Sequence, residues 1–400
     1  MSYNEIEGSV TAPKCFFAAG VSAGIKRSGN EDIALIYSES EGNVAGVFTT
    51  NKSCASSVTI DKEIIEEGKA QAIIINSGNA NACTGKRGYK DSKEMINLTA
   101  KKLGLDVDKV LVASTGIIGK FLPMNKVKRG ISEAFDNLSD EGGPLAAQAI
   151  MTTDTYAKEK AFEFEIAGKN VRIGGIAKGS GMIEPNMATM LGFLTTDLAI
   201  ESGLLKEALT EAVNQSFNRI TVDGDQSTND MVIILGNGEA GNEIIKEKNN
   251  DYYKFLEVLK ELTRWLAHQI VRDGEGATKF VEVEIKGAKS LEEAHKGARK
   301  IANSSLVKTA LFGEDPNWGR IVAAIGSAGV DFDLDNLEIE INGVKLLARE
   351  QQVTQEIKED LLASKDINIV VNLNNGDYSD RVWTCDLSYK YVEINGEYHT

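Results

Sequence analysis

Histidine, cysteine and proline are scarce in this chain of 400 residues, which has three, four and five of them. The cysteines Cys15, Cys54, Cys83 and Cys385 lie far apart and form no CxxC pair. This spacing argues against a zinc site or a disulfide framework and is typical of a reducing compartment. No apolar run approaches the length of a membrane-spanning helix, and the N-terminus lacks the basic start and apolar stretch of a signal peptide. We therefore expect a cytoplasmic protein without a membrane span.

Positive charge is also in deficit, because 44 Lys and Arg residues stand against 59 Asp and Glu residues and give a net charge of -15. An acidic chain disfavours the broad phosphate-binding surface that nucleic acids require. Neither nucleic acid nor a membrane is therefore expected as a partner, and small molecules are. No cluster of His, Cys and carboxylate residues has the spacing of metal ligands, so we predict no metal site.

Alternating apolar and charged residues predict strands at 162–166, 281–285 and 337–341. Such alternation is typical of half-exposed antiparallel strands. The third stretch runs into Asn342-Gly343 and then into a second apolar run at 344–347. Asn-Gly between two such runs is a strong signal for a type I′ turn. We expect a β-hairpin there.

Helical spacing of apolar residues predicts helices over 204–217, 253–271 and 291–301. The last of these begins with Ser290-Leu-Glu-Glu293, the pattern of a capping box. Helices and strands are interleaved without a regular βαβ rhythm, which favours an α+β fold with mixed or antiparallel sheets. No linker of the Pro, Ser or charge-run type is present, so composition marks no domain boundary.

The usual catalytic bases and phosphate-binding loops are not recognisable. His268 and His295 lie in predicted helices, and His399 lies beside the C-terminus, none of them in a catalytic motif. Histidine-based acyl chemistry is therefore not favoured. The segment 274–279 looks like a phosphate-binding loop, but it has the wrong glycine spacing and follows a predicted helix. Nucleotide binding is not supported.

The segment 174–197 is rich in glycine, contains the bend-fixing Pro185, and places Ala188 before Thr189 and the apolar run 190–194. A hydroxyl residue at the start of a buried strand is what a self-cleaving precursor needs. An N-to-O acyl shift and hydrolysis would free the α-amine of Thr189, and that amine, with a pKa near ~7.7–8.0, would supply the missing base. Taken alone, the same residues also describe a glycine-rich loop that enters an ordinary core strand.

Ten motifs follow one another along nearly the whole chain, at 46–51, 75–85, 114–116, 151–155, 178–183, 186–191, 221–225, 272–279, 315–320 and 391–400. In wording and order they resemble the ornithine acetyltransferase family of arginine biosynthesis. The resemblance implies a core like that of N-terminal-nucleophile enzymes, with layered mixed or antiparallel sheets flanked by helices and a smaller α/β subdomain.

The resemblance also implies cleavage between Ala188 and Thr189, which gives an α chain of residues 1–188 and a β chain of residues 189–400. Thr189 Oγ would attack the acetyl group of N2-acetyl-L-ornithine, and L-glutamate would take that group from the threonine ester. The implied assembly is a heterotetramer of two α and two β chains.

The family's oxyanion-stabilising pair falls on Thr115 and Gly116, where the residues alone predict a turn after a strand at 110–113. The family's substrate-contacting positions fall on Thr152, Lys178, Thr189, Glu275, Asn395 and Thr400. Lys178 suits a substrate carboxylate and Glu275 a substrate amine, because charges in a dry pocket need partners.

Each of these residues also has a simpler interpretation. Lys178 and Glu275 could be solvated loop charges, Thr152 a cap before Asp154, and Asn395-Gly396 the turn of a second hairpin.

Two other functions stay open at this point. A self-cleaving aminopeptidase or amidohydrolase with a similar core would use water in place of glutamate, and a binding protein could keep the fold without cleavage. No cofactor is expected. Some members of the resembled family also accept acetyl-CoA as a substrate, and no residue here decides that question.

Overall fold

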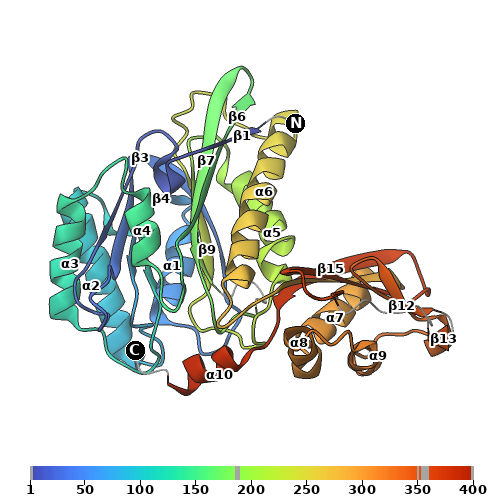
Figure 1. Ribbon diagram of the computed structural model, residues 1–400. Helices are drawn as coiled ribbons and strands as arrows, with labels where there is room; N and C mark the ends of the chain where they lie inside the picture. The colour runs from blue at the N-terminus through green and yellow to red at the C-terminus, as the bar shows by residue number, and fades with distance from the viewer. Residues whose placement is uncertain (1–2, 185–189, 349–350, 353–359, 398–400) are drawn as a thin grey trace.

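The computed structural model describes residues 3–184, 190–348, 351–352 and 360–397, which form two β-sheets with helices packed against them (Figure 1). Three predicted site residues, Ala188, Thr189 and Thr400, lie outside the described residues. Within the described ranges, no helix has the length and apolar character needed to cross a bilayer. The α+β class with mixed sheets is confirmed.

The larger sheet has nine strands in the order β1-β6-β7-β8-β9-β3-β4-β5, with β2 paired to β3. Its strands are β1 (Tyr3–Ile6), β2 (Phe16–Val21), β3 (Ile33–Phe48), β4 (Lys69–Asn76), β5 (Val110–Ser114), β6 (Lys158–Ile166), β7 (Lys169–Lys178), β8 (Leu191–Thr196) and β9 (Met231–Gly236). The pairs β4–β5 and β8–β9 are parallel and the other pairs are antiparallel. The predicted strand at 162–166 lies in β6, between two antiparallel neighbours as expected.

The smaller sheet has six strands in the order β13-β12-β11-β14-β10-β15. Its strands are β10 (Phe280–Ala288), β11 (Glu338–Ile341), β12 (Val344–Ala348), β13 (Gln351–Gln352), β14 (Asp366–Asn372) and β15 (Tyr378–Cys385). The predicted hairpin is confirmed as the antiparallel pair β11–β12. Only the short segment 273–279 separates the first strand of this sheet, β10, from the preceding helix at Asn250–Arg272. The chain therefore passes from one sheet to the other without a linker of distinct composition.

The predicted orientation of the strand at 281–285 was only half right. Its strand, β10, is antiparallel to β15 but parallel to β14. The apolar residues Val281, Val283 and Ile285 are fully buried, as the alternation indicated. Alternation reports which face of a strand is buried and not the direction of its neighbour, and β14 returns beside β10 only after several intervening helices and a hairpin.

Ten α-helices are assigned within the described residues. They are α1 (Ser56–Ile65), α2 (Gly85–Leu103), α3 (Met124–Asp136), α4 (Gly143–Ala149), α5 (Ser202–Asn214), α6 (Asn250–Arg272), α7 (Leu291–Ala302), α8 (Ser305–Phe312), α9 (Trp318–Gly326) and α10 (Tyr389–Gly396). All three predicted helices are present, although α5 ends three residues early and a short 3₁₀ turn follows it at 217–219. The Ser290 hydroxyl caps α7 by accepting a 3.1 Å hydrogen bond from the Glu293 N–H.

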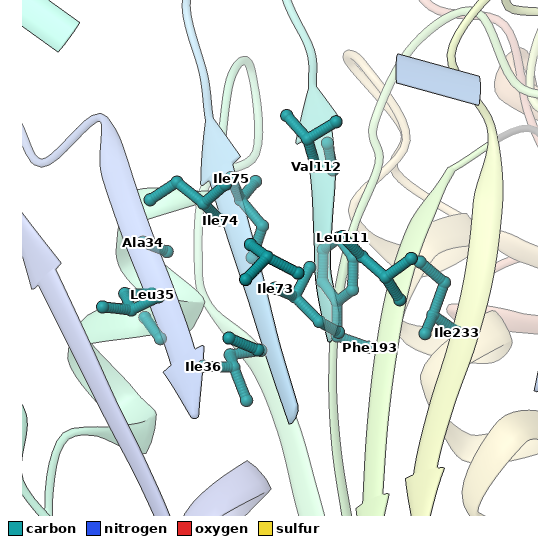
Figure 2. Packing of buried hydrophobic residues seen from close by; sticks show 14 of the residues in the cluster. Ala34, Leu35, Ile36, Ile73, Ile74, Ile75, Leu111, Val112, Phe193 and Ile233 are labelled. Atoms are coloured by element: carbon teal, nitrogen blue, oxygen red, sulfur yellow. The ribbon is translucent and has the colours of Figure 1, made fainter. Parts of the chain in front are cut away.

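The larger sheet is covered by helices on both faces. Helices α1 to α4 pack on one apolar cluster of its strands, and α5 and α6 pack on another (Figure 1). Figure 2 shows the centre of the first cluster, where the runs 34–36 and 73–75 pack beside Leu111, Phe193 and Ile233. Strands buried on both faces read as continuous apolar runs, which explains Ile73-Ile74-Ile75.

Candidate active site

One cavity of about 280 Å³ lies where β5 and β7 end and β8 and β9 begin. It is lined by all six predicted site residues that the structure describes, which are Thr115, Gly116, Thr152, Lys178, Glu275 and Asn395. These residues come from five separate segments of the chain. The family resemblance identified these residues in the sequence, and the fold brings them to a single cavity.

Thr115 and Gly116 form a turn directly after β5. The Thr115 N–H donates to the Asn76 carbonyl oxygen at 3.0 Å, so the donor that Thr115 can offer to the pocket is its hydroxyl. Gly116 has a φ of +128°, and a Cβ placed there would lie 2.4 Å from the carbonyl carbon of Gly78. The turn therefore requires glycine at 116 for both conformation and space.

Asn229 fixes the position of this turn, and the sequence analysis did not predict this role. Its side-chain amide nitrogen donates to the carbonyl oxygens of Ser114 at 2.7 Å and Ala80 at 2.6 Å. The residue is buried and lies two positions before β9. The polar run at 227–230 before an apolar strand was the only signal in the sequence, and it cannot reveal which loop Asn229 holds.

Lys178, the last residue of β7, is buried and is not a solvated loop residue. Its ammonium nitrogen lies 3.5 Å from the Thr115 hydroxyl oxygen. Burial lowers the pKa of Lys178, because the charged form loses its water, and the nearby carboxylate of Asp154 opposes that shift. A buried ammonium of this kind is suited to a carboxylate partner.

Glu275 is also buried, in the turn after α6. Its carboxylate accepts a 2.7 Å hydrogen bond from the Asn395 side chain, and its N–H donates to the Ser180 carbonyl at 2.9 Å. A Cβ on Gly181 would lie 2.4 Å from the Glu275 carboxylate, so glycine at 181 makes room for that group. Asn395 belongs to α10, and the interpretation of Asn395-Gly396 as a hairpin turn was wrong.

Thr152 is held by a buried ionic group that sequence reasoning did not find. The Thr152 N–H donates to Asp154 Oδ2 at 3.0 Å, so the side chain that accepts is that of Asp154 and not that of Thr152, unlike the simpler interpretation of Thr152 as the cap. The other oxygen of Asp154 lies 2.7 Å from the Lys158 ammonium, which in turn contacts Asp273 at 2.5 Å. Lys158 sits at the start of a strand with other charged residues, so nothing in its sequence context marks it as buried.

The two described histidines do not line the cavity. The ring of His268 packs against those of Trp383 and Phe280, with centroids 4.4 and 5.0 Å away. His295 contacts Asp380 at 2.9 Å. Burial and neighbouring guanidinium groups lower the pKa of each to about 4, so both are neutral at pH 7. Among the described residues, no set of three metal-binding side chains comes together.

Comparison with known proteins gives consistent matches along the chain. The model of the ArgJ family matches residues 17–400. The arginine biosynthesis bifunctional protein ArgJ of Caldanaerobacter subterraneus subsp. tengcongensis is 48% identical over 99% of both chains. The solved ArgJ of Bacillus halodurans is 44% identical, with a TM-score of 0.50, and covers 52% of this chain and 100% of its own. The ornithine acetyltransferase of Mycobacterium tuberculosis, solved with ornithine, is 39% identical with a TM-score of 0.44, over 47% of this chain and 100% of its own.

Proposed function

This chain belongs to the ArgJ family of arginine biosynthesis, and from that premise we propose that it uses Thr189 to move an acetyl group from N2-acetyl-L-ornithine to L-glutamate. The chain is an acyltransferase. One observation carries the proposed path, namely the convergence of the six described candidate residues on one cavity. Met190, the residue after Thr189 in the sequence, lines a small space beside that cavity together with Thr115 and Lys178.

The charges of the cavity match amino-acid substrates. Lys178 would pair with the substrate carboxylate and Glu275 with its free amine, so that both charges stay compensated away from water. Thr152 and Asn395 border the same space, and Thr400 is proposed to complete the substrate contacts. A ligand of opposite charges at two ends would be oriented by this pair alone.

In the proposed first half-reaction, the α-amine of Thr189 takes the hydroxyl proton as Oγ attacks the acetyl carbonyl carbon. The oxyanion accepts hydrogen bonds from the Thr115 hydroxyl and the Gly116 N–H. The bond from carbon to the N2 atom of ornithine breaks, N2 takes the proton, and an acetyl ester remains on Thr189. The amine of glutamate then attacks this ester and restores the threonine hydroxyl. The path needs no cofactor.

Self-cleavage between Ala188 and Thr189 is part of the proposal, because only cleavage frees the α-amine. It would divide the chain into the fragments 1–188 and 189–400, which are nearly equal in length. The solved Bacillus halodurans chain supports this division, because its whole length aligns with only 52% of the present chain. That solved chain is therefore about as long as one fragment.

The two fragments would remain together after cleavage. Strands β8 and β9 of the second fragment lie inside the larger sheet, between β7 and β3 of the first. Separation would break both strand ladders and expose buried apolar faces. We further propose a heterotetramer of two α and two β chains in the cytoplasm.

The test is a single-turnover experiment with N2-acetyl-L-ornithine and no glutamate. We expect about one ornithine released per active site and one acetyl group added to the fragment that begins at Thr189, since the ester has no acceptor. Adding glutamate should remove that acetyl group and yield acetylglutamate. Continuous release of ornithine without glutamate would indicate an amidohydrolase, which the family assignment does not favour, and an unacetylated fragment would contradict the proposal.

A parallel incubation with acetyl-CoA and glutamate, followed by free thiol, decides whether acetyl-CoA is a second donor.

A further inference from the structure

The carboxylate of Asp154 contacts Thr152, Gly179 and Lys158 beside the cavity. Its Oδ1 accepts a 2.7 Å hydrogen bond from the N–H of Gly179, the residue after Lys178. Its Oδ2 accepts one from the Thr152 N–H at 3.0 Å. The side chain is fully buried. One carboxylate therefore fixes the backbone beside two of the proposed substrate contacts.

Lys158 and Asp273 hold this carboxylate in place. The fully buried Lys158 ammonium lies between them, 2.7 Å from Asp154 and 2.5 Å from Asp273. The backbone carbonyl of Asp273 accepts a 2.5 Å hydrogen bond from the Ser180 hydroxyl. The ionic group thus connects the end of β7 with the turn that carries Glu275.

The same group sets the charge balance around Lys178. The charged groups with the largest effects on the Lys178 ammonium include Asp154, Asp230 and Glu275, which favour its charged form, and Lys158, which opposes it. Lys26 is a further cation that acts against it. Asp154 exerts the largest of these effects. In return, Lys158 and Lys178 outweigh the effect of burial on Asp154 and hold its pKa well below its usual range. At neutral pH Asp154 is therefore an anion.

We propose that Asp154 is the positioning residue of the substrate pocket, fixing the backbone at Thr152 and Gly179 and compensating the charge of Lys178 so that this ammonium binds a substrate carboxylate. This proposal rests on the proposed function, because it assumes that Lys178 binds that carboxylate. Asp154 itself contacts no substrate. Its loss should act through Lys178.

The test compares Asp154→Asn with Asp273→Asn as a matched control. Both variants remove one buried partner of Lys158, but the Asp273 carboxylate accepts from the N–H and hydroxyl of Thr155 and not from Thr152 or Gly179. Asp273 is also not one of the charged groups with the largest effects on Lys178. The measurement is the dissociation constant of L-ornithine, by calorimetry, between pH 6.5 and pH 9. The wild type is measured in parallel, and each variant is reported as the ratio of its dissociation constant to that of the wild type. The titration of L-ornithine itself cancels in this ratio.

Removing the anion should lower the pKa of Lys178 further, because burial then acts on the ammonium without the opposing charge of Asp154. The Asp154→Asn ratio should then rise with pH, by about tenfold per unit above that pKa, since only the ammonium binds a carboxylate. The Asp273→Asn ratio should stay flat. A flat ratio for Asp154→Asn, or an equal rise for Asp273→Asn, would overturn the proposal, because either is the behaviour of a purely structural residue.

If Asp154→Asn does not fold, the double variant Lys158→Met/Asp273→Asn tests the proposal from the other side. The double variant removes one positive and one negative charge, and Asp154 then acts on Lys178 without the opposing Lys158. The ratio of its ornithine dissociation constant to that of the wild type should therefore stay level or fall as the pH rises. A rising ratio would overturn the proposal.

Lys178→Met separates this proposal from the proposed function. Lost ornithine binding in Lys178→Met, together with a flat Asp154→Asn ratio, would defeat the role of Asp154 alone. Wild-type binding in Lys178→Met would defeat both.

Discussion

The ammonium nitrogen of Lys178 lies 3.5 Å from the hydroxyl oxygen of Thr115, although the two residues are 63 positions apart. One lies at the end of β7 and the other just after β5, and both are buried. The proposed carboxylate-binding group and the proposed oxyanion donor therefore share one wall of the cavity. A cation at this distance also favours negative charge on an oxygen bound to that hydroxyl.

Replacing Gly116 with alanine should disable the oxyanion turn. The new Cβ would collide with the Gly78 backbone and displace the Gly116 N–H. We expect kcat to fall by about 100-fold, the typical effect of losing one oxyanion donor, with little change in KM. Gly119→Ala is the matched control, because Gly119 also has a positive φ but nothing lies within 4 Å of its Cβ position. Similar kcat values for the two variants would argue against this role of the turn.

Replacing Gly181 with alanine should push the Glu275 carboxylate out of place, since the added Cβ would lie 2.4 Å from it. We expect KM for N2-acetyl-L-ornithine to rise by about tenfold, which corresponds to about 1.4 kcal/mol of binding. Gly203→Ala, at the start of α5 with open space around it, should leave steady-state kinetics unchanged. An unchanged KM in Gly181→Ala would exclude Glu275 as a substrate contact.

Asn395→Ala should weaken substrate binding by leaving the buried Glu275 carboxylate without its 2.7 Å hydrogen bond. Hydrogen bonds to charged groups contribute about 1.5–3 kcal/mol, so KM should rise by about tenfold or more. Val392→Ala on the same helix is the control, because Val392 is 67% exposed. Equal effects in both variants would mean that α10 matters only as a packing element.

His268 should make the protein less stable in acid. Burial, with Arg264 and Arg272, lowers its pKa from 6.5 to about 4 in the folded state. Between these values the unfolded chain binds the extra proton, so stability is complete above pH 6.5 and falls as the pH drops toward 4. The loss is on the order of 2 kcal/mol after allowance for partial exposure.

His268→Gln should therefore reduce the drop in thermal midpoint between pH 7 and pH 5. The reduction should be partial, because the pKa of His295 is also lowered to about 4 and that residue adds a similar contribution. A drop as large as that of the wild type would show that His268 does not carry the effect.

Local patterns predicted local structure well. The hairpin at Asn342-Gly343 and the cap at Ser290 follow from turn and capping chemistry within a few residues, and both are present. The parallel pairing of β10 with β14 could not be predicted, because it depends on where a strand much later in the chain returns.

The candidate site divides in the same way. The family motifs identified Thr115, Lys178 and Glu275. No local sequence pattern predicted the ionic group around Lys158 or the hydrogen bonds by which Asn229 holds the turn after β5. A lysine in an alternating strand is usually exposed. Only the tertiary fold, which brings the distant Asp273 to 2.5 Å from its ammonium, explains why Lys158 is buried.

The central claim, that Thr189 is both the cleavage point and the nucleophile, is tested most directly by the mass of the purified chain under denaturing conditions. The wild type should give two fragments, 1–188 and 189–400, each with about half the mass of the whole chain and the larger beginning at Thr189. Thr189→Ala should give a single 43.3 kDa chain without acetyl transfer. An intact wild-type chain that transfers acetyl groups, or a Thr189→Ala variant that does so at the wild-type rate, would contradict the account.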